Sequence, residues 1–235
     1  MEKSKIIEEL FYSILTYSYL LLPLAFVFFR VRKMEVIVIA LYGLLFFFLL
    51  NFDTDLQKKI LTKRLYYSLY TFLEYFIFTF LLWSNIKEKK IRKLIIILSI
   101  FFFAFQCTYY FIAKQWKLDT IPIGVETILI FIYIFFYFFQ YFRTTQNQYV
   151  YNEACFWVAV GVMIYLGGNF FFYILGNYIN QEEINFWFVT YIAETLKNIL
   201  LTVALFIYAR KPDENTKKNL PYLDLDFSFT DQQPY

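Results

Sequence analysis

The chain has 235 residues, of which 60% are hydrophobic and 25% aromatic, and it contains only six glycines and five prolines. A soluble domain of this length does not carry so large an apolar fraction, so the composition indicates an integral membrane protein. Histidine is absent, which removes the commonest metal ligand and general base, and the net charge of +3 does not suggest nucleic-acid binding.

Seven apolar runs follow one another along the chain. A bilayer core of about 30 Å needs about 20 helical residues at a rise of about 1.5 Å each. The runs cover residues 11–29, 34–51, 65–84, 94–114, 120–142, 155–179 and 186–209. The polar segments between them are too short to hold a soluble domain. We therefore expect an all-α membrane protein in which residues 1–211 form a seven-transmembrane helical bundle with short loops.

The first run is expected to be retained in the protein. It continues past 15 residues without a small-residue cleavage site, unlike a secretory signal peptide.

The distribution of Lys and Arg predicts the orientation of the bundle. The N-terminus and the second, fourth and sixth loops carry eight basic residues. The first, third and fifth loops and the C-terminus carry thirteen. We therefore expect the N-terminus outside and residues 212–235 as a cytoplasmic tail.

Polar side chains lie at a common depth in the expected helices. At a rise of about 1.5 Å per residue they fall about 9 to 17 Å from the outer end of their runs. The layer comprises Glu74, Gln106, Glu126, Asn169, Glu194 and Lys197. In a bilayer such side chains face the bundle interior or a water-filled cavity, which indicates a polar pocket in the outer half of the bundle.

The last run carries a polar stripe. At 100° per residue, its members fall on one face of a helix. They are Thr190, Glu194, Lys197, Asn198 and Thr202. Glu194 and Lys197 are three residues apart and can pair, with Glu74 and Glu126 as further partners.

Three acids and one base cannot all pair. The surplus indicates a protonated carboxyl, a water-filled cavity or a bound cation. A buried hydrogen-bond network that only fixes the helix register is the alternative. We expect a pocket for a small ligand or ion that contains Glu74, Gln106, Glu126, Asn169, Glu194, Lys197 and Asn198.

Three segments carry a family resemblance: YTFLEYFIFTFLLWSNIKEKKIRKLI, LDTIPIGVETILIFIYIFFYFFQ and YIAETLKNILL. Together they resemble uncharacterised seven-helix inner-membrane proteins of Bacteroidota, which are similar to the membrane sensor portions of histidine kinases. The resemblance implies a multi-pass protein of the bacterial inner membrane. It brings no ligand, and the chain has no kinase domain, so a sensor of this kind would signal through a partner protein.

Other functions are also compatible with the sequence. A proton- or ion-coupled transporter uses buried acids of this kind, and a subunit of a membrane complex is a further alternative. A third hypothesis is a retinal-binding protein that forms a Schiff base at Lys197, with Glu74 or Glu126 as counter-ion. No hydrolase, metalloprotease or nucleotide-binding motif is present, and we expect no enzyme, no catalytic residues and no metal site.

The C-terminal segment alternates apolar and polar residues. The apolar positions are Leu223, Leu225, Phe227 and Phe229. This period of two is typical of a half-buried strand, which is not stable alone. We expect residues 222–230 either to dock on the sheet edge of a partner or to remain a solvated end.

Overall fold

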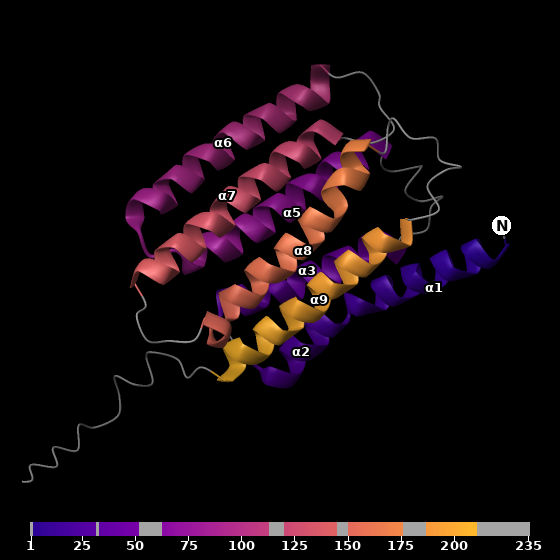
Figure 1. Ribbon diagram of the computed structural model, residues 1–235, viewed down its shortest axis with the longest axis horizontal. Coiled ribbons are helices and arrows are strands. Elements are labelled where there is room, and N and C mark those ends of the chain that lie inside the picture. The colour runs from indigo at the N-terminus through magenta and orange to yellow at the C-terminus, as the bar shows by residue number, and fades with distance from the viewer. Residues whose placement is uncertain are drawn as a thin grey trace, which may run out of the picture.

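The computed structural model describes residues 2–31, 33–51, 63–112, 120–144, 150–175 and 187–210. Within these ranges the secondary structure is helical and contains no strand (Figure 1). The helices are α1 (Glu2–Ser18), α2 (Leu21–Phe29), α3 (Met34–Asn51), α5 (Lys63–Asn85), α6 (Lys89–Ile112), α7 (Thr120–Thr144), the 3₁₀ helix η1 (Val150–Asn152), α8 (Ala154–Leu175) and α9 (Trp187–Arg210).

Six helical segments in the described ranges are long and apolar enough to cross a membrane. They are Ile6–Phe29, Met34–Asn51, Leu65–Asn85, Lys89–Ile112, Ile121–Arg143 and Phe188–Arg210. A further apolar stretch, Ala154–Phe170 in α8, is shorter. The prediction of an all-α multi-pass membrane protein is therefore supported by six segments of spanning length.

The first predicted run is not one continuous helix, because the chain breaks between α1 and α2. Pro23 has no amide hydrogen, so it cannot donate the helical bond to the carbonyl of Tyr19. That carbonyl instead accepts a 3.4 Å hydrogen bond from the amide of Leu22. The prediction of a single helix over residues 11–29 is corrected in this respect.

The break packs closely against α3 at Gly43. A Cβ atom at this position would lie 2.6 Å from the carbonyl oxygen of Tyr19 and 2.9 Å from Cδ of Pro23. Only glycine allows the two backbones to approach this closely. The contact fixes the position of Tyr19, whose side chain points into the bundle and is fully buried.

The helices run side by side, with α9 in extensive contact with its neighbours (Figure 1). α9 packs against α8 and also against α1, α2 and α3. α6 packs against α5 and α7 and lies at the edge of the bundle (Figure 1).

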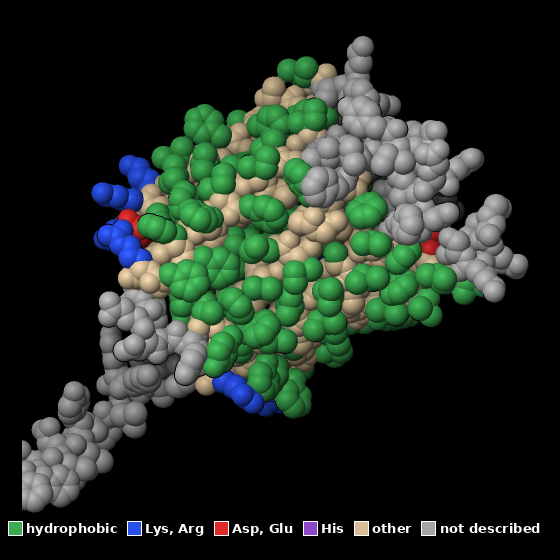
Figure 2. All heavy atoms as spheres, viewed as in Figure 1, with side chains coloured by type: hydrophobic (Ala, Val, Ile, Leu, Met, Phe, Trp, Pro, Cys, Tyr) green, Lys and Arg blue, Asp and Glu red, His purple; other side chains and the backbone are tan. Residues whose placement is uncertain are grey.

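Hydrophobic side chains cover the length of the bundle, whereas Lys and Arg gather at one end (Figure 2). This is the end at which α5 and α9 finish and α6 begins (Figure 1). Its exposed basic residues include Arg30, Lys87, Lys89, Lys90, Lys93, Arg143 and Arg210. An apolar belt bounded by basic side chains is the surface expected of a protein in a bilayer.

The predicted docking segment, residues 222–230 with Leu223, Leu225, Phe227 and Phe229, lies outside the described residues.

Candidate functional site

The polar stripe of α9 faces the bundle interior, as its spacing predicts. Glu194 is 6% exposed, and Lys197 and Asn198 are 0% exposed. Ile192 and Ile199, on the opposite side of the helix, are exposed. This part of the sequence-based prediction is confirmed.

Lys197 lies between two carboxylates. Its Nζ is 3.4 Å from Oε1 of Glu74 on α5 and 3.8 Å from Oε1 of Glu194 on its own helix. All three side chains are buried. A buried ion pair needs such close partners, because an isolated charge in this environment costs several kcal/mol.

Two tyrosine hydroxyls connect the ammonium to the same carboxylates. Lys197 donates to the hydroxyl of Tyr42, which donates to Glu74 over 3.0 Å. It also donates to the hydroxyl of Tyr19 over 3.5 Å, and Tyr19 donates to Glu194. Each tyrosine hydroxyl thus accepts one hydrogen bond and donates another. With a charged lysine, these donors and acceptors are all paired.

Each carboxylate has one further tyrosine donor. Tyr165 on α8 donates to Oε2 of Glu74 over 2.7 Å, and Tyr70 on α5 donates to Oε1 of Glu194 over 3.0 Å. Hydrogen bonds to ionised groups are the stronger ones, so these contacts favour charged carboxylates. The network therefore joins the turn between α1 and α2 to α3, α5, α8 and α9.

Aromatic rings complete the surroundings of Lys197. Its Nζ lies 3.8 Å from the ring centre of Tyr165 and 5.0 Å from that of Tyr42. These distances are within the range of cation–π attraction. Behind the lysine, a Cβ at Gly161 would lie 3.4 Å from the Lys197 carbonyl oxygen, which shows how closely α8 approaches α9.

A cavity of about 300 Å³ adjoins the network. Its lining residues include members of the last turn of α3 and of the first part of α5, α7 and α9. These helix ends lie at the same end of the bundle (Figure 1). Three carboxylates and six tyrosines line it, with a few aliphatic side chains. The polar lining consists of Glu74, Glu126, Glu194, Tyr12, Tyr66, Tyr67, Tyr70, Thr71, Tyr165 and Tyr191.

Glu126 is the third carboxylate of this cavity. It projects from α7, is 2% exposed, and its Oε1 has no hydrogen-bond partner among the described residues. Glu74 and Glu194 are held by tyrosines and by Lys197, whereas Glu126 is not part of that network. Its unpaired oxygen is the feature of the cavity that calls for an added partner.

The remaining residues of the predicted pocket do not line the cavity. Gln106 donates to Ser68 Oγ on α5 over 3.0 Å, and Asn198 donates to Ser18 Oγ on α1 over 2.8 Å. Asn169 is buried, and neither of its amide atoms has a partner in the described part of the chain. All three side chains are buried, as their shared depth predicts, but none of them is among the residues that line this cavity.

Among the residues that sequence reasoning missed, which include Tyr12, Tyr66 and Tyr191 of the cavity lining, Tyr19 and Tyr42 are the two that contact the lysine. Their hydroxyls contact both the lysine and the acids. In a chain with 22 tyrosines no local pattern distinguishes these two. The depth of Tyr19 and Tyr42 in their apolar runs was the one available signal.

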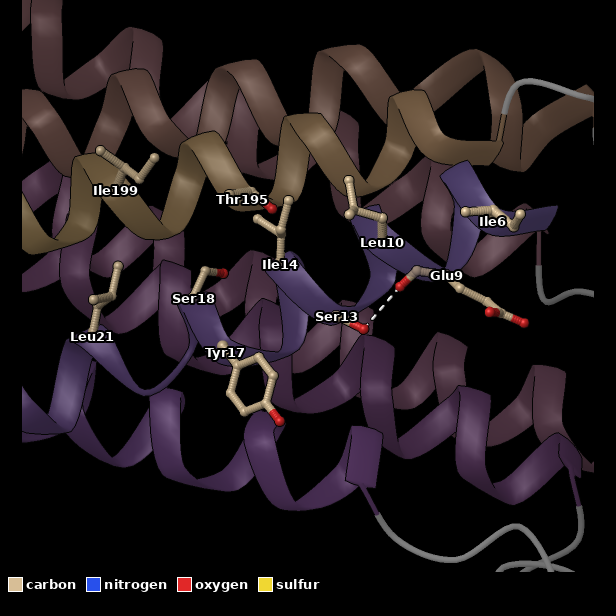
Figure 3. Close-up of a pocket in the computed structure, with 10 residues that line it drawn as sticks. All are labelled: Ile6, Glu9, Leu10, Ser13, Ile14, Tyr17, Ser18, Leu21, Thr195 and Ile199. Atoms are coloured by element: carbon tan, nitrogen blue, oxygen red, sulfur yellow. Dashed lines mark hydrogen bonds between the residues drawn. The ribbon is translucent and has the colours of Figure 1, made fainter. Parts of the chain in front are cut away.

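A second hollow is a groove of about 690 Å³ between α1 and α9 (Figure 3). Ile6, Leu10, Ile14 and Ile199 supply much of its lining. The hydroxyl of Ser13 donates back to its own helix, at the carbonyl of Glu9 (Figure 3). The groove offers mainly apolar surface, so the chemistry of the molecule is concentrated in the tyrosine-lined cavity.

The described residues contain no group of three or more His, Cys, Asp or Glu side chains that could hold a metal ion. The three glutamates of the cavity are thus spread over its walls. Comparison with family models, with curated proteins and with solved structures gives no match for this chain.

Proposed function

We propose that the protein is a membrane sensor that binds a small ligand in the tyrosine-lined cavity and passes its state to a partner protein. One observation carries this proposal. The cavity shares Glu74 and Glu194 with the network of Lys197, so any occupant that contacts these acids also changes the surroundings of the lysine.

The lysine network can act as a two-position element. Lys197 and Glu194 belong to α9, whereas Glu74 belongs to α5. An occupant that competes for Glu194 leaves the ammonium to Glu74, and one that competes for Glu74 does the reverse. The two arrangements favour different positions of α9 relative to α5, typically by about 1–2 Å for helix shifts of this kind.

We infer that the bundle crosses the membrane seven times, with α8 as the sixth span. α8 has 22 residues, which is about 33 Å at the rise of an α-helix and matches a hydrocarbon core of about 30 Å. The basic end of the bundle would then face the cytoplasm. The cavity would lie in the outer half, and α9 would carry the change toward the inner end.

The partner is proposed to bind at the cytoplasmic side through residues 222–230. A separate protein in the inner membrane or cytoplasm would supply the output.

Distance measurement between spin labels tests the sensor proposal. Labels at Lys87→Cys and Arg210→Cys report on the end of the bundle far from the cavity, in a Cys107→Ser/Cys155→Ala background. Glu194→Gln is expected to shift the distance distribution, because it removes one of the two charges that hold Lys197. The matched variant Glu9→Gln, on the outer surface of α1, should not. An identical distribution in all three proteins would contradict the proposal.

Proton- or ion-coupled transport is the second candidate, because the buried acids could also carry a coupling ion across the bundle. Flux into proteoliposomes distinguishes the two functions. A sensor produces no sustained flux, whereas a transporter produces a flux that is lost in Glu126→Gln and in Glu74→Gln.

Retinal binding at Lys197 is the third candidate, with the nearby carboxylates as counter-ions. Lys197 does not itself line the cavity, so a chromophore would have to displace the ring of Tyr165 or Tyr42. An absorption band that develops after retinal addition and is lost in Lys197→Ala would favour this function.

A further inference from the structure

We infer that the ligand of the tyrosine-lined cavity is a small organic ammonium ion, with Glu126 as its counter-ion. This inference rests on the proposed function in one respect, namely that the cavity is a ligand site. It is carried by three features of the described residues: the charge balance of the site, the free oxygen of Glu126 and the composition of the walls.

The charge balance favours a cation. Three carboxylates line the cavity, and the nearby base, Lys197, lies 3.4 Å from Glu74 and 3.8 Å from Glu194. Glu126 is not among its ion-pair partners. A positive ligand beside Glu126 would give this carboxyl group the ion-pair partner that it lacks, whereas an anion would face three acids.

The hydrogen bonds indicate where the charge of the ligand lies. Tyr165 already donates a hydrogen bond to Glu74, and Tyr70 donates one to Glu194, so the protein itself supplies hydrogen-bond donors to these two acids. Oε1 of Glu126 has no such donor within the described chain. This oxygen is covered by the protein, but Glu126 lines the cavity, so a turn of the carboxyl group would bring it to an N–H or N-methyl group of the ligand.

The walls favour an organic rather than an inorganic cation. A bare metal ion needs several oxygen ligands at about 2–2.6 Å, and the described residues hold no cluster of acids that could provide them. Tyr12, Tyr66 and Tyr191 are among the six tyrosines that line the cavity instead, and tyrosine rings attract alkylammonium groups. A volume of about 300 Å³ is at the lower end for small-molecule sites, so the ligand is small.

Ligand-dependent thermal stabilisation of the full-length protein in phosphatidylcholine nanodiscs tests the inference. The probes are n-butylammonium and tetramethylammonium chloride. The controls are 1-butanol, which has the same number of heavy atoms as n-butylammonium but no charge, and sodium chloride. We expect at least one ammonium to raise the melting temperature saturably, and neither control to do so.

Glu126→Gln locates the binding. It keeps the shape of the side chain and removes the charge, and it is expected to weaken ammonium binding by about 30-fold or more, as for other buried charge pairs. Glu9→Gln, on the outer surface of α1, is the control and should bind like the original protein.

Several results would overturn the inference. They are equal stabilisation by 1-butanol, equal stabilisation by sodium chloride, no stabilisation by either ammonium, or undiminished ammonium binding in Glu126→Gln. The spin-label pair at Lys87→Cys and Arg210→Cys separates this inference from the sensor proposal. If Glu194→Gln shifts the distance but no ammonium binds, only the ligand class is wrong. If ammonium binds without moving the labels, the ligand class stands and the sensor proposal fails.

Discussion

Nζ of Lys197 lies closer to Glu74 on α5 than to any acid on its own helix. The spacing of three residues in the sequence suggests Glu194 as the first partner, and this pair is also present at 3.8 Å. The shorter contact, at 3.4 Å, joins α9 to α5 through two residues that are 123 positions apart in the sequence. A lysine shared in this way links the position of α9 to that of α5.

Removing the shared charge should destabilise the bundle. Lys197→Met leaves two buried acids without their base, and the loss of one partner from a buried pair costs about 3–5 kcal/mol. Lys197→Met/Glu74→Gln should recover part of this loss, because one unpaired acid is removed as well. Unfolding in a denaturing detergent measures both variants. Equal stability of the single and double variants would show that Glu74 and Lys197 do not interact.

The break between α1 and α2 gives a second prediction. Gly43→Ala should lower stability by about 1–3 kcal/mol, because its Cβ would lie 2.6 Å from the Tyr19 carbonyl oxygen. Gly167→Ala is the matched control, since its Cβ would come no closer than 3.6 Å to Phe131. Melting temperatures of the two variants provide the comparison. A loss at Gly167 as large as that at Gly43 would contradict the close packing of α3 on the break.

The helices and the inward face of α9 could be predicted from the sequence, because run length and helical periodicity are local properties. The sequence also drew attention to Glu74, Glu126 and Glu194, which line one cavity, because few acids occur in the apolar runs. That Gln106 and Asn169 lie outside this cavity could not be predicted, because both are buried and depth in a helix does not specify which neighbours an inward-facing side chain meets. The break near Pro23 had a local signal in the proline, but its consequence for Tyr19 depends on Gly43 in another helix.

The proposed orientation of the bundle predicts that the C-terminus lies in the cytoplasm. A reporter fused after Tyr235 should be active as a cytoplasmic protein, because thirteen basic residues belong to that side and eight to the other. Alkaline phosphatase, which is active only outside the cytoplasm, should be inactive at the same position. An active phosphatase fusion would invert the topology and place the cavity in the inner half.

The C-terminal segment is expected to be separable from the bundle. Truncation after Asn219 should leave the melting temperature of the bundle unchanged and abolish co-purification of a cytoplasmic partner. Asp224→Ala/Asp226→Ala is a milder variant that retains the apolar positions Leu223, Leu225, Phe227 and Phe229 and should retain the partner. If the truncated protein still captures every protein that the full chain does, residues 222–230 are only a solvated end.

The state of the Lys197 side chain tests the central claim most directly. Nitrogen-15 NMR of lysine-labelled protein distinguishes a buried ammonium, whose protons exchange slowly, from exposed ammonium groups, whose protons exchange rapidly. A slowly exchanging signal should be present, disappear in Lys197→Met, and shift in both Glu74→Gln and Glu194→Gln, because the ammonium is shared between the two acids. No protected signal in the original protein, or a signal that shifts with only one of the two glutamates, would contradict the shared lysine on which the proposed sensor depends.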